Sequence, residues 1–301
     1  MKIKAAIDIG TNSTRMLIAD FASPNILKPL IFKERITRLG ENLQKRGELS
    51  SEAISRVIKV LLEYKDVISQ NQAFLSGVIT TSAARDASNQ EEFIQKIKKE
   101  TGLLCEIVSG DDEAQLTLLG VKGAFANESN LFICDVGGGS TEFIASENLE
   151  KTRKLSINIG SRRLTEQFFH HDPVERIETA ALRKFLIHTL INELADFPEL
   201  SWNCIATGGT ASTLALIDLQ RDFSQTDRAH GHKLINHRLD SIIEDLTRKS
   251  NEERKSIKGL HPDRADVILA GALILRAVQA YWHVSTITVS NWDLLHGLLL
   301  K

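Results

Sequence analysis

Asp135-Val-Gly-Gly-Gly-Ser-Thr-Glu142 is the stretch of this sequence that decides the fold. An apolar run, Leu131–Cys134, precedes it and indicates a buried strand, and a second apolar run, Phe143–Ala145, follows it. Three consecutive glycines between two strands form a turn whose backbone N–H groups are not covered by side chains, because glycine reaches positive φ without steric cost. Convergent N–H groups bind anions. The loop therefore predicts a phosphate site, although a glycine-rich hairpin turn without a ligand is an alternative.

Polar residues of the same loop provide further ligand atoms. Asp135 and Glu142 flank the turn, where their carboxylates are candidate ligands of a divalent cation beside the anion, since hard cations such as Mg²⁺ prefer oxygen ligands. The predicted phosphate contacts are the N–H groups and hydroxyls between them, from Gly137, Gly138, Gly139, Ser140 and Thr141.

The N-terminal stretch Asp8-Ile-Gly-Thr-Asn-Ser-Thr-Arg15 repeats this design between two more apolar runs. Asp8 aligns with Asp135 and is a metal candidate, Ser13 aligns with Ser140, and Arg15 aligns with Glu142. The predicted phosphate contacts of this stretch are Asn12, Ser13 and Arg15. Internal repetition over a long separation indicates two related domains. We therefore predict two α/β domains, each with one strand–loop–strand phosphate hairpin, facing one cleft.

Length and composition agree with two ordinary globular domains. The 301 residues are 42% apolar and 25% charged, and the net charge of −2 gives no field that would favour nucleic acid. No apolar run reaches the roughly 18 residues of a membrane span, and the three cysteines lack metal-binding spacing. We expect a cytoplasmic protein without a membrane partner, divided into domains 1–125 and 126–301, with the last helix packing back on the first domain.

Four further motifs carry candidate site residues. Arg85 follows the predicted strand Phe74–Thr80, where its planar guanidinium is suited to phosphate oxygens, although a surface pair with Asp86 is the alternative. Glu113 opens a helix; acids there usually complement the helix dipole, but at the seam between domains this one would be the natural general base for water. Adjacent arginines, of which Arg163 is the predicted contact, and a third loop also suggest phosphate binding; this third loop consists of Gly208, Gly209 and Thr210.

Together these stretches resemble the exopolyphosphatase/guanosine pentaphosphate phosphatase (Ppx/GppA) family, within the actin-like, sugar-kinase and heat-shock ATPase superfamily. The resemblance covers nearly the whole chain and rests on seven motifs, of which the Arg85 and Glu113 motifs are specific to the family. The motifs are Asp8–Ser13, Thr81–Asn89, Ser109–Ala114, Asp135–Glu142, Arg163–Glu166, Gly208–Thr210 and Arg264–Gly271.

The resemblance implies two ribonuclease-H-like domains around a central cleft. It also implies hydrolysis of the terminal phosphate of polyphosphate, or of the 5′ γ-phosphate of guanosine pentaphosphate, with Mg²⁺ or another divalent cation. Guanosine tetraphosphate is a further expected ligand. The resemblance further implies that Glu113 is the general base and that Asp135 and Glu142 are linked to the metal. It implies that Arg85 and the two loops that contain Ser13 and Ser140 hold phosphates.

Two departures from the family pattern affect these expectations. The acidic pair is usually Glu-Glu, whereas here it is Asp112-Glu113, so the catalytic second position is retained. The usual closing Gly-Leu-Arg-Glu-Gly is replaced by Asp293-Leu-Leu-His-Gly297, which puts contacts at the last helix in doubt. The chain ends there, without the helical domains of longer exopolyphosphatases, which favours short chains or nucleotides as substrates.

Three questions stay open from the sequence. A kinase of the same superfamily is one alternative, although the Arg85 and Glu113 motifs favour water as the acceptor. A non-hydrolytic sensor of polyphosphate or of a guanosine alarmone is another. The sequence decides neither between polyphosphate and guanosine pentaphosphate nor the oligomeric state, and a homodimer is compatible with it.

Overall fold

The N-terminal stretch Asp8–Arg15 joins strand β1 (Ile3–Ile9) to strand β2 (Ser13–Ser23) at the centre of a five-stranded sheet. The structure, a computed structural model, describes residues 3–23, 26–147, 151–197 and 203–301. By contacts within the chain it forms two units: unit 1 is Met1–Gly123 with Trp292–Lys301, and unit 2 is Ala124–Asn291. The expected boundary between the domains was after residue 125, whereas unit 1 runs to Gly123. The last helix, α12 (Leu294–Leu300), belongs to unit 1.

The sheet of unit 1 has the strand order β3-β2-β1-β4-β5. Its first three strands form an antiparallel meander, and β4 and β5 continue in parallel with β1. Its remaining elements are β3 (Ile26–Ile36), β4 (Phe74–Thr80), β5 (Cys105–Ile107), α1 (Leu43–Arg46), α2 (Ser51–Gln70), α3 (Ser82–Asp86), α4 (Gln90–Thr101) and α5 (Gly110–Ala124).

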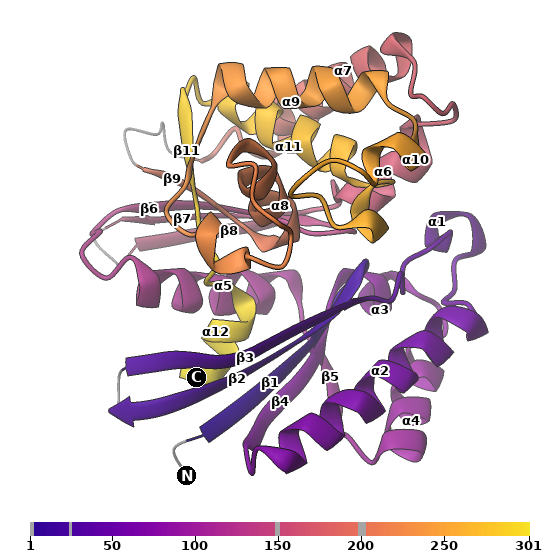
Figure 1. Cartoon of the computed structure of the whole chain (residues 1–301), viewed down its shortest axis with the longest axis vertical. Coiled ribbons are helices and arrows are strands. Elements are labelled where there is room, and N and C mark those ends of the chain that lie inside the picture. The colour runs from indigo at the N-terminus through magenta and orange to yellow at the C-terminus, as the bar shows by residue number, and fades with distance from the viewer. Residues whose placement is uncertain (1–2, 24–25, 148–150, 198–202) are drawn as a thin grey trace. The chain divides into compact units, whose positions relative to one another are not determined.

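The side chains of β1 alternate between two packed faces, as the pleat of a strand requires. Ala5, Ile7 and Ile9 pack with the apolar stripe of α2, whose buried positions recur at helical spacing, and with α4. Figure 1 shows α2 and α4 side by side on this face of the sheet. Ala6, on the opposite face, packs with leucines of α12 and with Leu116 of α5. Asp8 follows Ala6 at a spacing of two, so its side chain projects from the α12 face.

Unit 2 contains a six-stranded sheet with the order β10-β11-β9-β6-β7-β8. Strands β6, β7 and β8 form an antiparallel meander, and β9 and β11 extend the sheet in parallel with β6. The elements are β6 (Leu131–Val136), β7 (Thr141–Glu147), β8 (Lys151–Ile157), β9 (Cys204–Thr207), β10 (Lys233–Ile235), β11 (Thr286–Val289), α6 (Ser161–Phe168), α7 (Arg176–Glu193), α8 (Gly208–Asp218), η1 (Thr226–Ala229), α9 (Asn236–Arg248), α10 (Asn251–Arg254), η2 (Pro262–Arg264) and α11 (Ile268–Tyr281).

Helix α11 lies at the centre of the helical layer of unit 2 (Figure 1). It contacts α6, α7, α8 and α9, and this explains why its sequence is apolar nearly all round rather than on one stripe. Phe132, Cys134 and Val136 of β6 pack into the same core.

Both units therefore repeat one topology: an antiparallel three-strand meander followed by parallel strands. This confirms the predicted fold class of two α/β domains of ribonuclease-H-like type. That the two glycine hairpins face one cleft stays a prediction.

Candidate active site

The two glycine hairpins have matching backbone geometry. In the first, Asp8 pairs with Arg15 across β1 and β2, and the Gly10 N–H donates to the Ser13 carbonyl over 2.9 Å. In the second, Asp135 pairs with Glu142 across β6 and β7, and the Gly137 N–H donates to the Ser140 carbonyl over 3.0 Å. The repeat read from the sequence is thus a repeat of structure, with an aspartate at the end of the first strand in each copy.

Asn12 and Ser13 lie at the turn of the first hairpin. Ser13 begins β2, and the backbone carbonyl of the buried Asn12 accepts hydrogen bonds from the N–H groups of Thr37 and Arg38. These bonds hold the first turn against the segment that follows β3. The side chain of Arg15, predicted to contact phosphate, instead donates both Nε and Nη2 to Asp8 Oδ2, over 3.0 and 2.6 Å.

The second glycine loop is held by the start of α6. Carbonyl groups of the three glycines accept hydrogen bonds there: Gly137 O from Ser161 N (2.9 Å), Gly138 O from Arg162 N (2.9 Å) and Arg163 N (3.1 Å), and Gly139 O from Arg163 Nε (2.7 Å). The cis peptide bond found in the described residues is Asp172–Pro173, so the loop peptides are trans. In a trans peptide the C=O and N–H point in opposite directions. The N–H groups of Gly138, Gly139 and Ser140 therefore point away from α6.

Arg163 is a structural support of this loop in the observed geometry, since its Nε binds a loop carbonyl. Its neighbour Arg162 is buried and pairs with Asp266 at 2.9 Å and with Glu166 at 3.7 Å. Gly160, the N-cap of α6, touches the loop so closely that a Cβ on it would lie 2.4 Å from the Gly138 carbonyl.

Glu142 and Thr141 lie buried at the start of β7. Glu142 Oε1 accepts hydrogen bonds from the hydroxyls of Ser140 (2.8 Å) and Ser156 (2.7 Å). The Thr141 hydroxyl donates to the Ile159 carbonyl over 2.5 Å, so this donor is already used within the protein. Ser156 was not among the predicted residues; it lies opposite Glu142 in the β7–β8 register, and only that pairing reveals it.

The third loop packs against the second hairpin in unit 2. Gly208 has φ of +86°, and a Cβ on it would lie 2.5 Å from Asp135 Oδ1, so glycine is required for both reasons. A Cβ on Gly209 would lie 2.1 Å from the Arg264 guanidinium. Thr210 packs against α11, where a Cβ on Gly271 would lie 2.5 Å from its methyl group. The loop thus brings Asp135 and Arg264 to the N-terminus of α8.

Arg85 and Glu113 come together in unit 1. Arg85 Nη1 donates to the Val108 carbonyl just after β5 (2.9 Å) and to Glu113 Oε2 (3.2 Å). Their side chains are 25% and 11% exposed, so the pair is reachable from solvent but mostly enclosed. Glu113 lies in the first turn of α5, where the positive end of the helix dipole favours an ionised carboxylate.

The carboxylates present suit Mg²⁺ bound together with a phosphate. In the described part of the chain no three His, Cys, Asp or Glu side chains gather as a complete metal cage. Mg²⁺, however, is usually held by one or two carboxylates, substrate phosphates and waters. Asp8 Oδ1 is buried and makes no hydrogen bond to any described residue, so its lone pairs are not used by a described protein donor. Burial raises the pKa of Asp8 despite the opposing effect of Arg15.

The fold and these residues define a class: an α/β protein built from two copies of a glycine-hairpin unit. The family model described as "Ppx/GppA phosphatase family" matches residues 6–301. The chain belongs to the Ppx/GppA phosphatase family.

Individual relatives agree with this assignment. The chain is 34% identical to the bifunctional 3-dehydroquinate synthase/phosphatase of Fusobacterium nucleatum, over 99% of this chain and 46% of that protein. It is 31% identical to exopolyphosphatase 2 of Mycobacterium tuberculosis, over 99% of this chain and 97% of that protein. The crystal structure of an exopolyphosphatase from Cytophaga hutchinsonii superposes with a TM-score of 0.89 at 25% identity, covering 99% of this chain and 96% of that one.

The described residues include no helix that is both long enough and apolar enough to cross a bilayer.

Proposed function

We propose that this protein is a phosphohydrolase that removes the terminal phosphate of inorganic polyphosphate by attack of water, with Glu113 as general base and a divalent cation, Mg²⁺, as cofactor. The observation that carries the proposal is the Arg85–Glu113 pair, a guanidinium and a carboxylate 3.2 Å apart at the carboxyl end of β4 and the start of α5. The arginine supplies charge for phosphate oxygens, and the glutamate supplies the proton acceptor that water needs. A relative named as an exopolyphosphatase supports polyphosphate as the substrate.

The reaction assigns one task to each group. Each unit offers groups suited to phosphate oxygens: the N–H groups of Gly138, Gly139 and Ser140 in unit 2, and the guanidinium of Arg85 in unit 1. Such groups matter because phosphoryl transfer depends mainly on positioning and on neutralising the phosphate oxygens. Glu113 accepts a proton from water as the new O–P bond forms and the bridging P–O bond breaks. The shortened chain leaves with the bridging oxygen. Asp8 in unit 1, and Asp135 and Glu142 in unit 2, are the carboxylates that would hold Mg²⁺, which would supply further positive charge to the phosphates.

Guanosine pentaphosphate carries the same terminal phosphoanhydride, so its hydrolysis would use the same groups. Relatives named as exopolyphosphatases make polyphosphate the first substrate to test. The test measures phosphate release from polyphosphates of several lengths and from guanosine pentaphosphate, each with Mg²⁺ and with a chelator.

Phosphate release that requires the cation and is lost in Glu113→Gln supports the proposal. Tight binding of polyphosphate with no release by the wild-type protein would instead indicate a sensor. Phosphate found on an added acceptor rather than in solution would indicate a kinase. Either of these results would overturn hydrolysis.

A further inference from the structure

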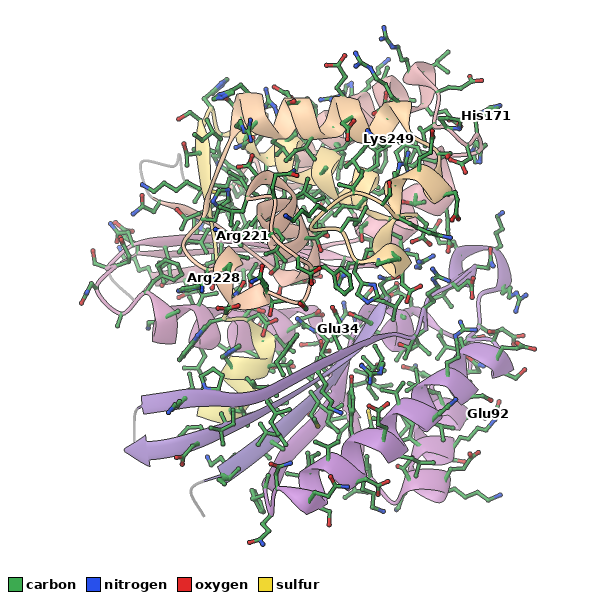
Figure 2. All side chains as sticks on the ribbon, in the orientation of Figure 1. Glu34, Glu92, His171, Arg221, Arg228 and Lys249 are labelled. Atoms are coloured by element: carbon green, nitrogen blue, oxygen red, sulfur yellow. The ribbon has the colours of Figure 1, made fainter. Side chains whose placement is uncertain are left out.

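The side chain of Arg15 lies between two carboxylates of unit 1. Its Nε and Nη2 both donate to one oxygen of Asp8, Oδ2, while its Nη1 donates to Asp293 Oδ2. Glu34, labelled in Figure 2, is the register partner of Arg15 on β3. Both Asp8 and Asp293 are buried, and the Arg15 side chain is only 14% exposed. The guanidinium is therefore directed along the sheet and toward α12, and its Nε, Nη1 and Nη2 all donate to carboxylates of the protein.

Two donors on one oxygen leave the other oxygen of Asp8 without a partner. Oδ1 is buried and makes no hydrogen bond with any residue that the structure describes. A buried carboxylate oxygen without a hydrogen bond is costly, unless a ligand satisfies it. Since Arg15 fixes Oδ2, the orientation of Oδ1 is also fixed.

Asp293 is itself held at the start of α12. Its Oδ1 accepts from the Leu295 N–H over 3.0 Å, which caps the helix, and lies 3.3 Å from His296 Nδ1. The backbone around it is in close contact with α5: a Cβ on Gly120 would lie 2.0 Å from the Asp293 carbonyl oxygen. Asp293 is thus set in place by the helix that carries Glu113 in its first turn.

The net charge of Arg15, Asp8 and Asp293 together favours a bound cation. One guanidinium lies between two buried carboxylates, so the three side chains carry one net negative charge when all are ionised. The oxygen of this group that makes no hydrogen bond to a described residue is Oδ1 of Asp8, so the group offers a cation both a net negative charge and an unused acceptor.

We infer that Arg15 and Asp293 are positioning residues that hold Asp8 so that its Oδ1 is presented to a divalent cation. The inference deepens the proposed function, on which it rests for the identity of the cation. It gives a role to Asp293, which stands in the closing motif where this sequence departs from its family. It also replaces the predicted phosphate contact of Arg15 by a contact with two carboxylates.

Binding of Mn²⁺, measured by electron paramagnetic resonance in the absence of substrate, tests the inference. Asp293→Asn keeps a side chain that caps α12 but removes the charge that holds Arg15. We expect its Mn²⁺ affinity to fall about 10–100-fold, the usual effect of removing a partner behind a metal ligand. Arg15→Lys keeps the charge but has one donor nitrogen in place of the three that bind Asp8 and Asp293. It is expected to show a similar loss. Asp8→Asn should lose at least as much.

The matched control is Asp227→Asn, which removes an exposed carboxylate that is paired with Arg228 in unit 2. Its Mn²⁺ affinity should equal that of the wild type, and thermal unfolding of each variant shows that it is folded. Wild-type affinity in both Asp293→Asn and Arg15→Lys, or in Asp8→Asn, would overturn the inference. Because substrate is absent, the result is separate from the proposed function: a wild-type protein that binds Mn²⁺ through Asp8 but releases no phosphate would contradict the hydrolase proposal alone.

Discussion

The guanidinium of Arg85 lies 3.2 Å from the carboxylate of Glu113, although 28 residues separate them in the chain. The contact is set by the strand ends: Arg85 follows β4 in the short helix α3, and its Nη1 is anchored on the carbonyl of Val108, just after the neighbouring parallel strand β5. Ligands of open α/β sheets gather at this edge. Arg85 and Glu113, from two separate sequence motifs, therefore form one contact pair in unit 1.

Replacing Glu113 by glutamine tests the proposed base. Glu113→Gln keeps the shape of the side chain and removes its basicity, so kcat for phosphate release should fall by about 10²–10⁴-fold while substrate binding survives. Asp112→Asn is the matched control, because Asp112 interacts with Ser109 at the start of the same helix. Equal and mild losses in the two variants would reduce Glu113 to an acid that complements the helix dipole.

Replacing Arg85 by alanine tests the predicted phosphate contact. Loss of a charged hydrogen bond is worth roughly 1.5–3 kcal/mol, so kcat/KM for phosphate release should fall at least about tenfold. Arg35→Ala is the control: it breaks another arginine–glutamate pair, with Glu63 at 2.8 Å, on the surface of the same unit. Steady-state kinetics on polyphosphate provide the measurement, and similar values for the two variants would place Arg85 outside the site.

Replacing Gly160 by alanine tests the phosphate loop without touching its residues. The new Cβ would lie 2.4 Å from the carbonyl of Gly138, so the loop must move to make room. A displacement of about 1 Å in a positioned group can cost about 10²-fold in rate, and we expect a loss of kcat/KM approaching that size. Gly77→Ala, whose Cβ would meet Leu298 only at 3.4 Å, should remain near wild type. Unchanged kinetics in Gly160→Ala would show that this loop does not hold the substrate.

His171 provides a pH-dependent contribution to stability. Its exposed ring, labelled in Figure 2, lies 3.1 Å from Glu178 and 3.7 Å from Glu175. The hydrogen bond to Glu178, and then the charge of Glu175, raise the pKa of His171 above its ordinary 6.5. A raised pKa means that the stabilisation is complete below about pH 6.5 and is lost as the pH rises through the folded-state pKa.

The melting temperatures of wild type and His171→Gln should therefore differ at about pH 5 and converge toward about pH 8.5. In a Glu178→Gln background the difference at low pH should shrink, because the main partner of the imidazolium is gone. A difference that stays constant across this pH range would contradict the charge–charge origin of the effect.

The sequence by itself determined the features that depend on neighbours along the chain. Each glycine hairpin is a strand, a turn and a returning strand, so its apolar runs and glycines were enough to predict the hairpins over Asp8–Arg15 and Asp135–Glu142. The structure adds the register, in which Asp8 pairs with Arg15 and Asp135 with Glu142. The repetition of that local pattern predicted two related α/β units, and both sheets have the expected topology. The third motif, Gly208–Thr210, was predicted as a loop leading into a helix, and in the structure it forms the first residues of α8, directly after β9.

Only the tertiary structure decided which partner each polar side chain takes. Arg15 and Arg163 were both predicted to contact phosphate. In the structure Arg15 binds two carboxylates, and Arg163 binds a loop carbonyl. Arg15 meets Asp293 across 278 residues of sequence, because α12 packs on the face of the sheet from which Asp8 projects. The long side chain of an arginine can reach any of several acceptors, and the fold alone fixes which acceptor lies within hydrogen-bonding distance. Local patterns therefore predicted where the loops are, and packing between distant segments set the direction of the charged groups around them.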